Sequence, residues 1–387
     1  MIDDVVIVGY TELKNELKSN RSVYELAGEV LSDILTSTNI EKRAIDGFCA
    51  ASSLTEGNHL FYGAHLTELL GLSLNWFMTT SAGGTAVLSG VAAAASALRD
   101  GRCEVALVLG VDAPSTANSL ELGAYWDGFQ SPTGALTPPA QFGLLMRAYQ
   151  LAYGLDPRAL GKIAVTLRKG ALANDNALAR LRRPLTLDEY LDSRYIADPL
   201  RLLDSVMFCD GGNGVVLTTA RHAAQLGLKR MARIAGYAER TGHLAAQTMP
   251  DVLETGFSVA GPKAMAQAGL RHDRVSMLQA YDDFTIAVLI QLEQIGFCER
   301  GGGSDYILAH DFSPTGDLPL NTGGGQLSAG QPGLAGGGLI LVEAVRQLFG
   351  EAGSRQISSP TNALVTGIGA IPYAQNWLMS SVMVLES

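Results

Sequence analysis

The sequence of 387 residues has few charged side chains, few cysteines and no apolar run long enough to span a bilayer. Only 17% of its residues are Asp, Glu, Lys or Arg, whereas 47% are hydrophobic, so we expect a large core and a buried interface between subunits. Four cysteines without paired spacing exclude a disulfide framework and a zinc site made only of cysteines. The formal net charge of −10 argues against nucleic acid as a partner.

The N-terminal residues 1–4 lack the features of a secretory signal. Because no candidate membrane span is present either, the sequence predicts a cytoplasmic protein without membrane contact. The glycine runs 323–325 and 336–338 are not followed by Lys-Ser or Lys-Thr, so they do not predict phosphate-binding loops. We expect no metal site, because metal-ligand spacing is absent from His59, His65, His243 and His310.

The most distinctive feature that is present is a double glycine before an apolar run. Gly83 and Gly84 open a run of Ala, Val, Leu, Ser and Gly residues that ends at Asp100-Gly101. The run has no clear polar face, which predicts a helix buried on all sides. Glycines before a helix allow close approach of a ligand, and the first N–H groups of the helix can stabilise a negatively charged oxygen. A core helix with a tight entry turn explains the same residues, and both interpretations stay open at this point.

The chain contains one pattern of elements twice. Each half has a strand, a helix and a second strand, followed by a glycine-rich entry, a buried helix and a strand, which predicts an internal duplication. Alternating helices and apolar strands favour parallel or mixed sheets covered by helices. We predict an N-terminal half at 1–225 and a C-terminal half at 226–387. The proline-rich residues from about 114 to 204 are predicted to be an insertion that lies over the core.

Four groups of segments, in this order, resemble signatures of the thiolase superfamily, and the resemblance covers nearly the whole chain. They are residues 83–110, residues 195–211, the segment Gln279–Thr285 that is similar to a His-Asp-Cys-Phe block, and residues 318–324 with 343–348. The resemblance implies an α/β protein with the thiolase fold, a duplicated αβαβα five-layer architecture with an inserted lid region. It is strongest to sterol-carrier-type thiolase-like proteins that act on acyl-CoA thioesters.

The catalytic residues of a thiolase are missing at the matching positions. The nucleophilic cysteine falls on Gly84, and the second cysteine falls near Gly367. Gln331 stands where the activating histidine is expected, and Tyr281 and Asp283 replace the His and Cys of the His-Asp-Cys-Phe block. None of the four cysteines of the chain matches a nucleophile position, so acyl transfer through a cysteine is not predicted.

A tyrosine in place of that histidine, without a thiolate, resembles the steroid side-chain aldolases of the superfamily. This resemblance implies a lyase that cleaves a β-hydroxyacyl-CoA by a retro-aldol reaction, with coenzyme A as part of the substrate and no other cofactor. The reaction needs a base for the hydroxyl, stabilisation of the thioester enolate and an acid. We predict that Tyr281 exchanges a proton with the hydroxyl and that N–H groups of Gly83 and Gly84 hold the enolate oxygen. Asp283, or a water held by Gln331, supplies the acid.

Structural roles stay open for the same residues. Tyr281 can be a buried core tyrosine, Asp282 and Asp283 can form a helix N-cap pair, and Gln331 can be an ordinary loop amide. A different function is open as well. The chain can be a non-catalytic acyl-CoA-binding or scaffolding subunit, or, less favoured, an acyltransferase that uses a neighbouring nucleophile such as Ser81.

Asn321 and Gly324 complete the predicted substrate-binding residues. Asn321 either orients Tyr281 or caps the glycine turn. The resemblance further implies a homodimeric core and a separate small partner of the zinc-ribbon/OB-fold type that helps to bind the acyl-CoA.

Overall fold

The strands form two similar half-sheets that meet edge to edge. The computed structural model describes residues 5–117, 134, 137–243, 251–369 and 377–387; within these ranges a sheet of nine strands has the order β3-β2-β4-β7-β1-β8-β11-β10-β9. Strand β1 pairs with β8 through only two residue pairs, Val6 with Arg233 and Ile7 with Ala232. Strands from residues 5–219 lie on one side of this junction, and strands from residues 232–386 lie on the other.

The strands are β1 (Val5–Glu12), β2 (Gly47–Ala51), β3 (Trp76–Thr80), β4 (Val105–Asp112), β7 (Gly211–Thr219), β8 (Ala232–Thr241), β9 (Leu278–Gln279), β10 (Asn362–Ile368) and β11 (Met379–Glu386). A separate hairpin joins β5 (Tyr195–Ala197) to β6 (Leu200–Arg201). Both half-sheets are mixed, because β2 is parallel to β3 and β4 and β9 is parallel to β10, whereas the other pairs are antiparallel.

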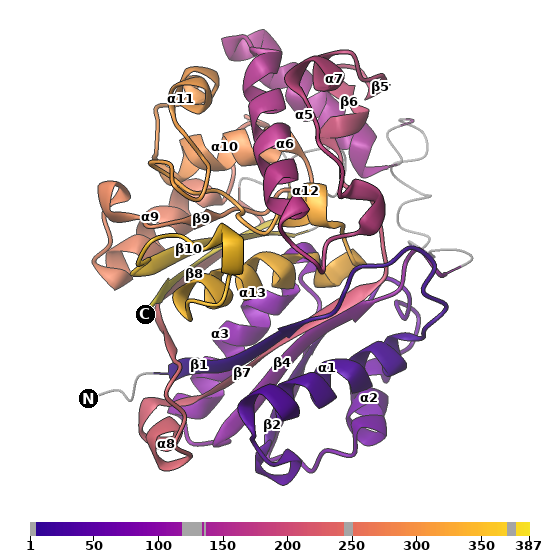
Figure 1. Cartoon of the computed structure of the whole chain (residues 1–387), viewed down its shortest axis with the longest axis vertical. Coiled ribbons are helices and arrows are strands. Elements are labelled where there is room, and N and C mark those ends of the chain that lie inside the picture. Colours follow the sequence, from indigo (N-terminus) through magenta and orange to yellow (C-terminus); the bar gives the residue numbers. More distant parts are fainter. Residues whose placement is uncertain (1–4, 118–133, 135–136, 244–250, 370–376) are drawn as a thin grey trace.

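Helices form three layers around the half-sheets (Figure 1). The outer layers are α1 (Val23–Thr38) with α2 (Tyr62–Leu70) on one side and α9 (Phe257–Ala268) with α10 (Thr285–Ile295) on the other. Between the half-sheets lie α3 (Ala86–Arg99) and α13 (Gly336–Leu348), which contact each other. Both central helices begin in glycine-rich turns and consist largely of buried small or aliphatic residues. The predicted five-layer αβαβα architecture is therefore confirmed.

The described part of the predicted insertion contains α5 (Pro138–Tyr153), α6 (Pro157–Leu172), α7 (Leu187–Leu191) and the β5-β6 hairpin. Helix α6 packs on α10, on α11 (Gly303–Ala309) and on α12 (Gly325–Ala329), so the insertion, which follows β4 of the first half, covers helices of the second half (Figure 1). Residues 118–133 and 135–136 of the predicted insertion lie outside the described residues, as do residues 1–4. A short helix α8 (Ala220–Gln225) precedes β8.

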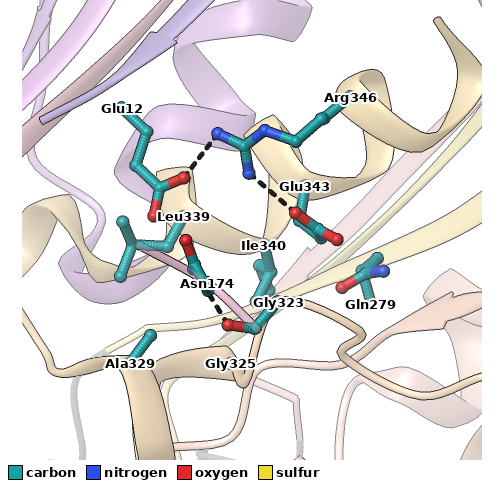
Figure 2. Close-up of a pocket in the computed structure, with 10 residues that line it drawn as sticks. All are labelled: Glu12, Asn174, Gln279, Gly323, Gly325, Ala329, Leu339, Ile340, Glu343 and Arg346. Carbon is teal, nitrogen blue, oxygen red and sulfur yellow. Dashed lines mark hydrogen bonds and ion pairs between the residues drawn. The ribbon is translucent and has the colours of Figure 1, made fainter. Parts of the chain in front are cut away.

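A buried ion-pair network joins the two halves (Figure 2). The guanidinium of Arg346 on α13 lies 2.6 Å from Glu12 on β1 and 2.7 Å from Glu343 one turn earlier. Arg355 pairs with the same Glu343 at 3.0 Å, and Asn174 of the insertion donates to the carbonyl of Gly323 at 3.0 Å. The cavity between these residues measures about 10 Å³, which is room for a water molecule and not for a substrate.

The described helices include none that is both long and apolar enough to cross a bilayer.

Candidate active site

A cavity of about 370 Å³ is lined by both halves of the chain and by the insertion. Its wall is mainly apolar with a few polar groups, which is typical of small-molecule sites. Five of the seven predicted site residues are on this wall, namely Gly83, Gly84, Tyr281, Asp283 and Gln331. The other lining residues are Leu54, Pro138, Pro139, Gln141, Phe142, Ser205, Val206, Phe208, Phe284, Gly333, Leu334 and Gly369.

The backbone of Tyr281 is fixed from two sides. Tyr281 lies between the end of β9 and the start of α10, and its side chain is only 3% exposed. Its N–H donates to Thr366 Oγ1 of β10 at 2.8 Å, and its carbonyl accepts from Gln291 Nε2 of α10 at 2.7 Å. Because Thr366 and Gln291 also bond to each other, the position of the phenol is determined by both neighbouring elements.

The phenol of Tyr281 occupies the room that a side chain at position 84 would need. The turn Gly83–Thr85 leads into α3, and Gly83 has a φ of +58°, a conformation that favours glycine. A Cβ atom on Gly84 would lie 1.9 Å from the Tyr281 hydroxyl oxygen. The position that matches a thiolase nucleophile is therefore filled by a side chain from the second half of the chain.

Two buried amides lie beside the phenol. Gln331 Nε2 is 3.5 Å from the Tyr281 hydroxyl, a long hydrogen bond, and it donates to Gln326 Oε1 at 3.2 Å. The backbone of Gln331 is held by Met207 at 2.9 Å and by Cys209 at 3.0 Å. Gln331 thus has a structural backbone role and also presents its side chain to the cavity.

Burial controls the ionisation of Tyr281. Desolvation raises the pKa of its phenol well above the ordinary value, and the nearby Asp283 carboxyl raises it further. The amides of Gln331 and Gln326 act in the opposite direction, since they favour the anion. The phenol is therefore neutral in the resting site.

Asp283 is a carboxyl in an apolar environment. Desolvation raises its pKa well above the ordinary value, and the charge of Asp282 adds to this effect. Its Oδ1 atom is buried and has no hydrogen-bond partner among the described residues. A carboxyl on a cavity wall with one buried oxygen that lacks a partner can bind a ligand through that oxygen.

Asp282 has a capping role, but for a distant helix. Its carboxylate accepts from the N–H groups of Gln326 at 2.8 Å and Leu327 at 3.1 Å, at the start of α12. Burial raises the pKa of Asp282 to about 7, and these N–H groups oppose the rise. One residue of the Asp pair is thus a cap, as the structural interpretation expected, although it caps α12 and not the helix that follows it in sequence.

Asn321 and Gly324 do not line the cavity. Asn321 Nδ2 donates to the carbonyl of Ala280 at 2.8 Å, directly before Tyr281, and its own carbonyl accepts from Gly324 at 2.8 Å. Gly324 has a φ of +100° and lies against Ala171 of α6. Both residues shape the support of Tyr281, so the geometry does not favour the predicted contact of either with substrate.

Aromatic rings form one wall of the cavity. Phe284 follows Asp283 and stacks on Phe142 of α5, with 4.0 Å between ring centroids. Trp377 extends the stack behind Phe142 at 6.2 Å. Pro138 and Pro139 at the start of α5 continue the apolar surface. A wall of this kind suits a flat apolar group and excludes water from the polar end of the cavity.

No thiol lies on the cavity wall. The four free cysteines are Cys49, Cys103, Cys209 and Cys298, and all four lie elsewhere in the structure. Within the described ranges, no group of three or more His, Cys, Asp or Glu residues is arranged to hold a metal ion.

Three residues that support the site were missed by the sequence analysis. Thr366, Gln291 and Gln326 are fully buried and contact Tyr281 directly or through Gln331. No local pattern marks them, because each lies in an ordinary apolar element and acquires its role only when distant segments meet.

Comparison with known proteins identifies relatives of the chain. Residues 238–385 match a family described as thiolase C-terminal domain-like. A steroid side-chain-cleaving aldolase from Thermomonospora curvata is 31% identical over 386 residues, which cover 94% of each chain. A 17-hydroxy-3-oxo-4-pregnene-20-carboxyl-CoA lyase from Mycobacterium tuberculosis is 30% identical over 387 residues, 95% of this chain and 96% of the relative.

Solved structures of an aldolase and of a thiolase-like protein are also similar to this chain. The structure titled "Ltp2-ChsH2(DUF35) aldolase" has a TM-score of 0.85 at 28% identity and covers 100% of this chain and 98% of its own. A monomeric SCP2-thiolase-like protein type 1 from Mycobacterium smegmatis has a TM-score of 0.75 at 20% identity, with 100% and 78% coverage, and supports the fold alone. The chain belongs to the thiolase superfamily. Within it, the chain is similar to the steroid side-chain-cleaving aldolases.

Proposed function

We propose that the protein is a carbon–carbon lyase that cleaves a β-hydroxyacyl-CoA by a retro-aldol reaction. The observation that carries this proposal is the juxtaposition of Tyr281 and Asp283 on one apolar cavity, at a double-glycine turn that has no thiol. Retro-aldol cleavage needs proton transfer and enolate stabilisation but no covalent intermediate. The names of the two relatives that are at least 30% identical, an aldolase and a lyase, support the same reaction class.

The two acidic groups divide the proton transfers. The pKa of the Asp283 carboxyl is raised well above its ordinary value, which makes its carboxylate a stronger general base than an ordinary one. Tyr281, whose pKa is raised well above its ordinary value, stays neutral and acts as the acid. This assignment reverses the sequence prediction, in which Tyr281 exchanged its proton with the hydroxyl and Asp283 was the acid.

The cycle balances in three proton movements. The Asp283 carboxylate takes the proton of the β-hydroxyl while the bond between the α and β carbons breaks, so a ketone or aldehyde leaves. The electron pair of that bond forms the thioester enolate, and Tyr281 donates its proton to the α carbon. The proton on Asp283 then returns to the Tyr281 oxygen, and both groups regain their starting forms.

The turn at Gly83 and Gly84 is the proposed site of the enolate oxygen. Both glycines line the cavity, and the turn precedes α3. The N–H groups of Thr85 and Ala86 bond back to the carbonyls of Ala82 and Gly83, so the N–H groups of Gly83 and Gly84 are the proposed donors. Such donors stabilise an anion that develops in a site with little water, and the loss of one costs about 3 kcal/mol in barrier.

The apolar wall defines the substrate class. Phe142, Phe284 and Phe208, together with the two prolines, offer an apolar surface to the group that carries the β-hydroxyl. A rigid polycyclic group of the steroid type suits this surface. The relative that is named as a carboxyl-CoA lyase of a hydroxylated pregnene supports the same class.

A homodimer with a small partner protein completes the proposal. Strand β3 is an edge of the nine-stranded sheet, and its Phe77 and Met78 are 42% and 40% exposed, so a second copy can pair with this edge and cover them. A partner of the zinc-ribbon/OB-fold type is supported by the structural relative whose title joins two protein names. Co-expression with such a partner and size-exclusion chromatography would test for the complex.

The function is tested by incubating the purified protein, with and without the partner, with β-hydroxyacyl-CoA esters whose hydroxyl is on a polycyclic group. Mass spectrometry should show a ketone together with the shortened acyl-CoA. Tyr281→Phe removes the acid and should lower turnover about 100-fold or more with the fold retained. Tyr62→Phe is a matched control, because the Tyr62 hydroxyl is buried on α2 without a described partner, away from the cavity.

Two outcomes contradict the proposal. Absence of a carbonyl product from every such ester, with the partner present, would favour the non-catalytic acyl-CoA-binding subunit. An acyl-enzyme trapped by mass spectrometry would favour the acyltransferase.

A further inference from the structure

Gln326 is buried beside the proposed acid but does not line the cavity. It is fully buried in the first turn of α12, and its N–H donates to Asp282 at 2.8 Å. Its carbonyl oxygen Oε1 accepts from Gln331, whose amide nitrogen also lies next to the Tyr281 hydroxyl. Its own amide nitrogen Nε2 has no hydrogen-bond partner among the described residues. A buried N–H₂ group without a partner is costly in a folded protein, so its retention calls for an explanation.

The surroundings bring the Gln326 amide close to the phenol. Glycines at the start of α13 lie beside both side chains: a Cβ on Gly336 would lie 2.1 Å from Gln326 Oε1, and a Cβ on Gly337 would lie 3.6 Å from the ring of Tyr281. The Gln326 amide is also among the groups that favour the anion and so lower the pKa of Tyr281. A side chain at position 336 would therefore displace the Gln326 amide.

The hydrogens of Gln331 alone are too few for a Tyr281 anion, so the Gln326 amide has a role to fill. The N–H₂ group of Gln331 has two hydrogens, and one of them is used on Gln326 Oε1. Only one hydrogen is left for the Tyr281 oxygen, which becomes an anion in a desolvated place once its proton has moved to the α carbon. A buried phenolate needs more than one donor, and the free N–H₂ of Gln326 is the next one available.

We propose that Gln326 is a positioning residue of the active site, which orients Gln331 through its carbonyl and donates its free N–H₂ to the Tyr281 oxygen when that oxygen becomes negative. Gln326 acts through Tyr281 and does not touch substrate, so it changes the rate of proton transfer and leaves substrate binding unchanged. The inference rests on the proposed function for its effect on turnover, but its effect on the phenol can be measured without any substrate.

The test places difluorotyrosine at position 281, because fluorine lowers the phenol pKa into a range that the folded protein tolerates. Fluorine NMR then follows the titration in the full chain without ligand. In the Gln326→Met variant, which keeps the volume and removes both the donor and the acceptor, we expect this pKa to rise by about one unit, a tenfold change in the ionisation equilibrium. With an active substrate, kcat should fall about 10- to 100-fold while KM stays within about twofold.

Gln347→Met is the matched control. Gln347 is an equally buried glutamine on α13 that bonds to Thr322 and Arg355 and not to Tyr281. Its loss should lower the melting temperature and leave the titration at position 281 unchanged. If Gln326→Met also lowers only the melting temperature, with the titration and kcat of the wild type, Gln326 is structural and the inference is wrong.

Gln326→Leu provides a second variant of similar size, should the methionine variant fail to fold. The role of Gln326 and the retro-aldol function are contradicted by different results. A shift of the phenol pKa in a protein that cleaves no ester would support the role of Gln326 and contradict the retro-aldol function, whereas cleavage with an unshifted pKa would do the reverse.

Discussion

A single close contact at the residue scale explains why a thiolase-like site carries no thiol. The ring of Tyr281 lies where a side chain at position 84 would be, so the two positions cannot both be large. A cysteine at position 84 and a tyrosine at position 281 would collide, so a site with this tyrosine requires a residue without a side chain at position 84.

Gly84→Ala should therefore damage the site although it adds only one methyl group. The new Cβ would lie 1.9 Å from the Tyr281 hydroxyl, so the phenol must move. This overpacking should lower the free energy of unfolding by about 1–3 kcal/mol. Urea unfolding and turnover should both show the loss. In a Tyr281→Ala background the same methyl group meets no ring, and the stability cost should disappear. Equal costs in the two backgrounds would show that the contact does not exist in solution.

Asp283 should give opposite pH dependences of activity and stability. Burial and the neighbouring Asp282 raise the pKa of this carboxyl on folding, so the folded state binds the proton more tightly than the unfolded chain. Its contribution to stability is complete below the unfolded pKa of about 3.9 and is lost as pH rises toward the folded pKa. The base form needed for cleavage appears over the same rise, so kcat should increase with pH through the folded pKa.

Asp283→Asn separates these effects, because the amide has the shape of the neutral acid and no titration. The variant should lose turnover at every pH, and its melting temperature at neutral pH should equal or exceed that of the wild type. Thermal unfolding at several pH values measures the difference, which should grow as pH rises. A variant that is less stable than the wild type throughout would show that the carboxylate makes favourable contacts.

At the scale of elements, strand β3 should determine the oligomeric state. Its central residue, Met78, is 40% exposed at the edge of the nine-stranded sheet. If two copies pair antiparallel about this residue, the two Met78 side chains lie next to each other across the symmetry axis. Met78→Lys would place two like charges there and should convert a dimer to a monomer in sedimentation velocity experiments.

Another exposed methionine, away from β3 in the sheet order, provides a control. Met231 precedes β8 and is 37% exposed, and Met231→Lys should leave the sedimentation coefficient of the wild type unchanged. A wild-type protein that sediments as a monomer at all concentrations would contradict the dimer.

Most elements follow from local sequence, and the exceptions have a physical reason. The helical periodicity of Ser22–Leu35, the apolar run Glu104–Val111 and the glycine-rich entry at Gly83 are local signals. Each is found where the pattern predicts it, as α1, β4 and the start of α3. Strand β3 was missed because its middle residues are exposed, so it has no buried pattern. The apolar segment Val275–Tyr281 predicts a strand, whereas only Leu278–Gln279 is a strand in the structure, because the last residues of the segment leave the sheet to form the site.

The candidate site was predictable only in part for the same reason. Tyr281, Asp283 and Gln331 could be named because they stand at positions that match a known signature. Gln326 and Gln291 could not, since their roles depend on contacts between α12, α10 and the Tyr281 segment, and a sequence without this geometry shows them as ordinary buried amides.

At the scale of the whole molecule, the two halves are joined by charges more than by the sheet. The β1–β8 junction has two residue pairs, whereas Arg346 on α13 reaches both Glu12 of the first half and Glu343 of its own helix. The guanidinium and both carboxylates are at most 9% exposed (Figure 2). Removal of the cation would leave two buried carboxylates with less compensation, which is far more damaging than the loss of a surface pair.

Arg346→Met should accordingly destabilise the protein by about 3–5 kcal/mol in urea unfolding at neutral pH. Burial alone would raise the pKa of Glu343, but Arg346 and Arg355 outweigh it and lower this pKa. A lowered pKa means that the stabilisation is complete above the unfolded pKa and is lost as pH falls through the folded pKa, so the difference in free energy of unfolding between wild type and variant should narrow in acid.

Arg102→Met, which removes an exposed pair with Asp100 at 3.2 Å, should cost less than about 1 kcal/mol at any pH. If Arg346→Met costs no more than Arg102→Met, the halves are joined by packing alone. If instead it splits unfolding into two transitions, this arginine is what makes the halves unfold as one unit.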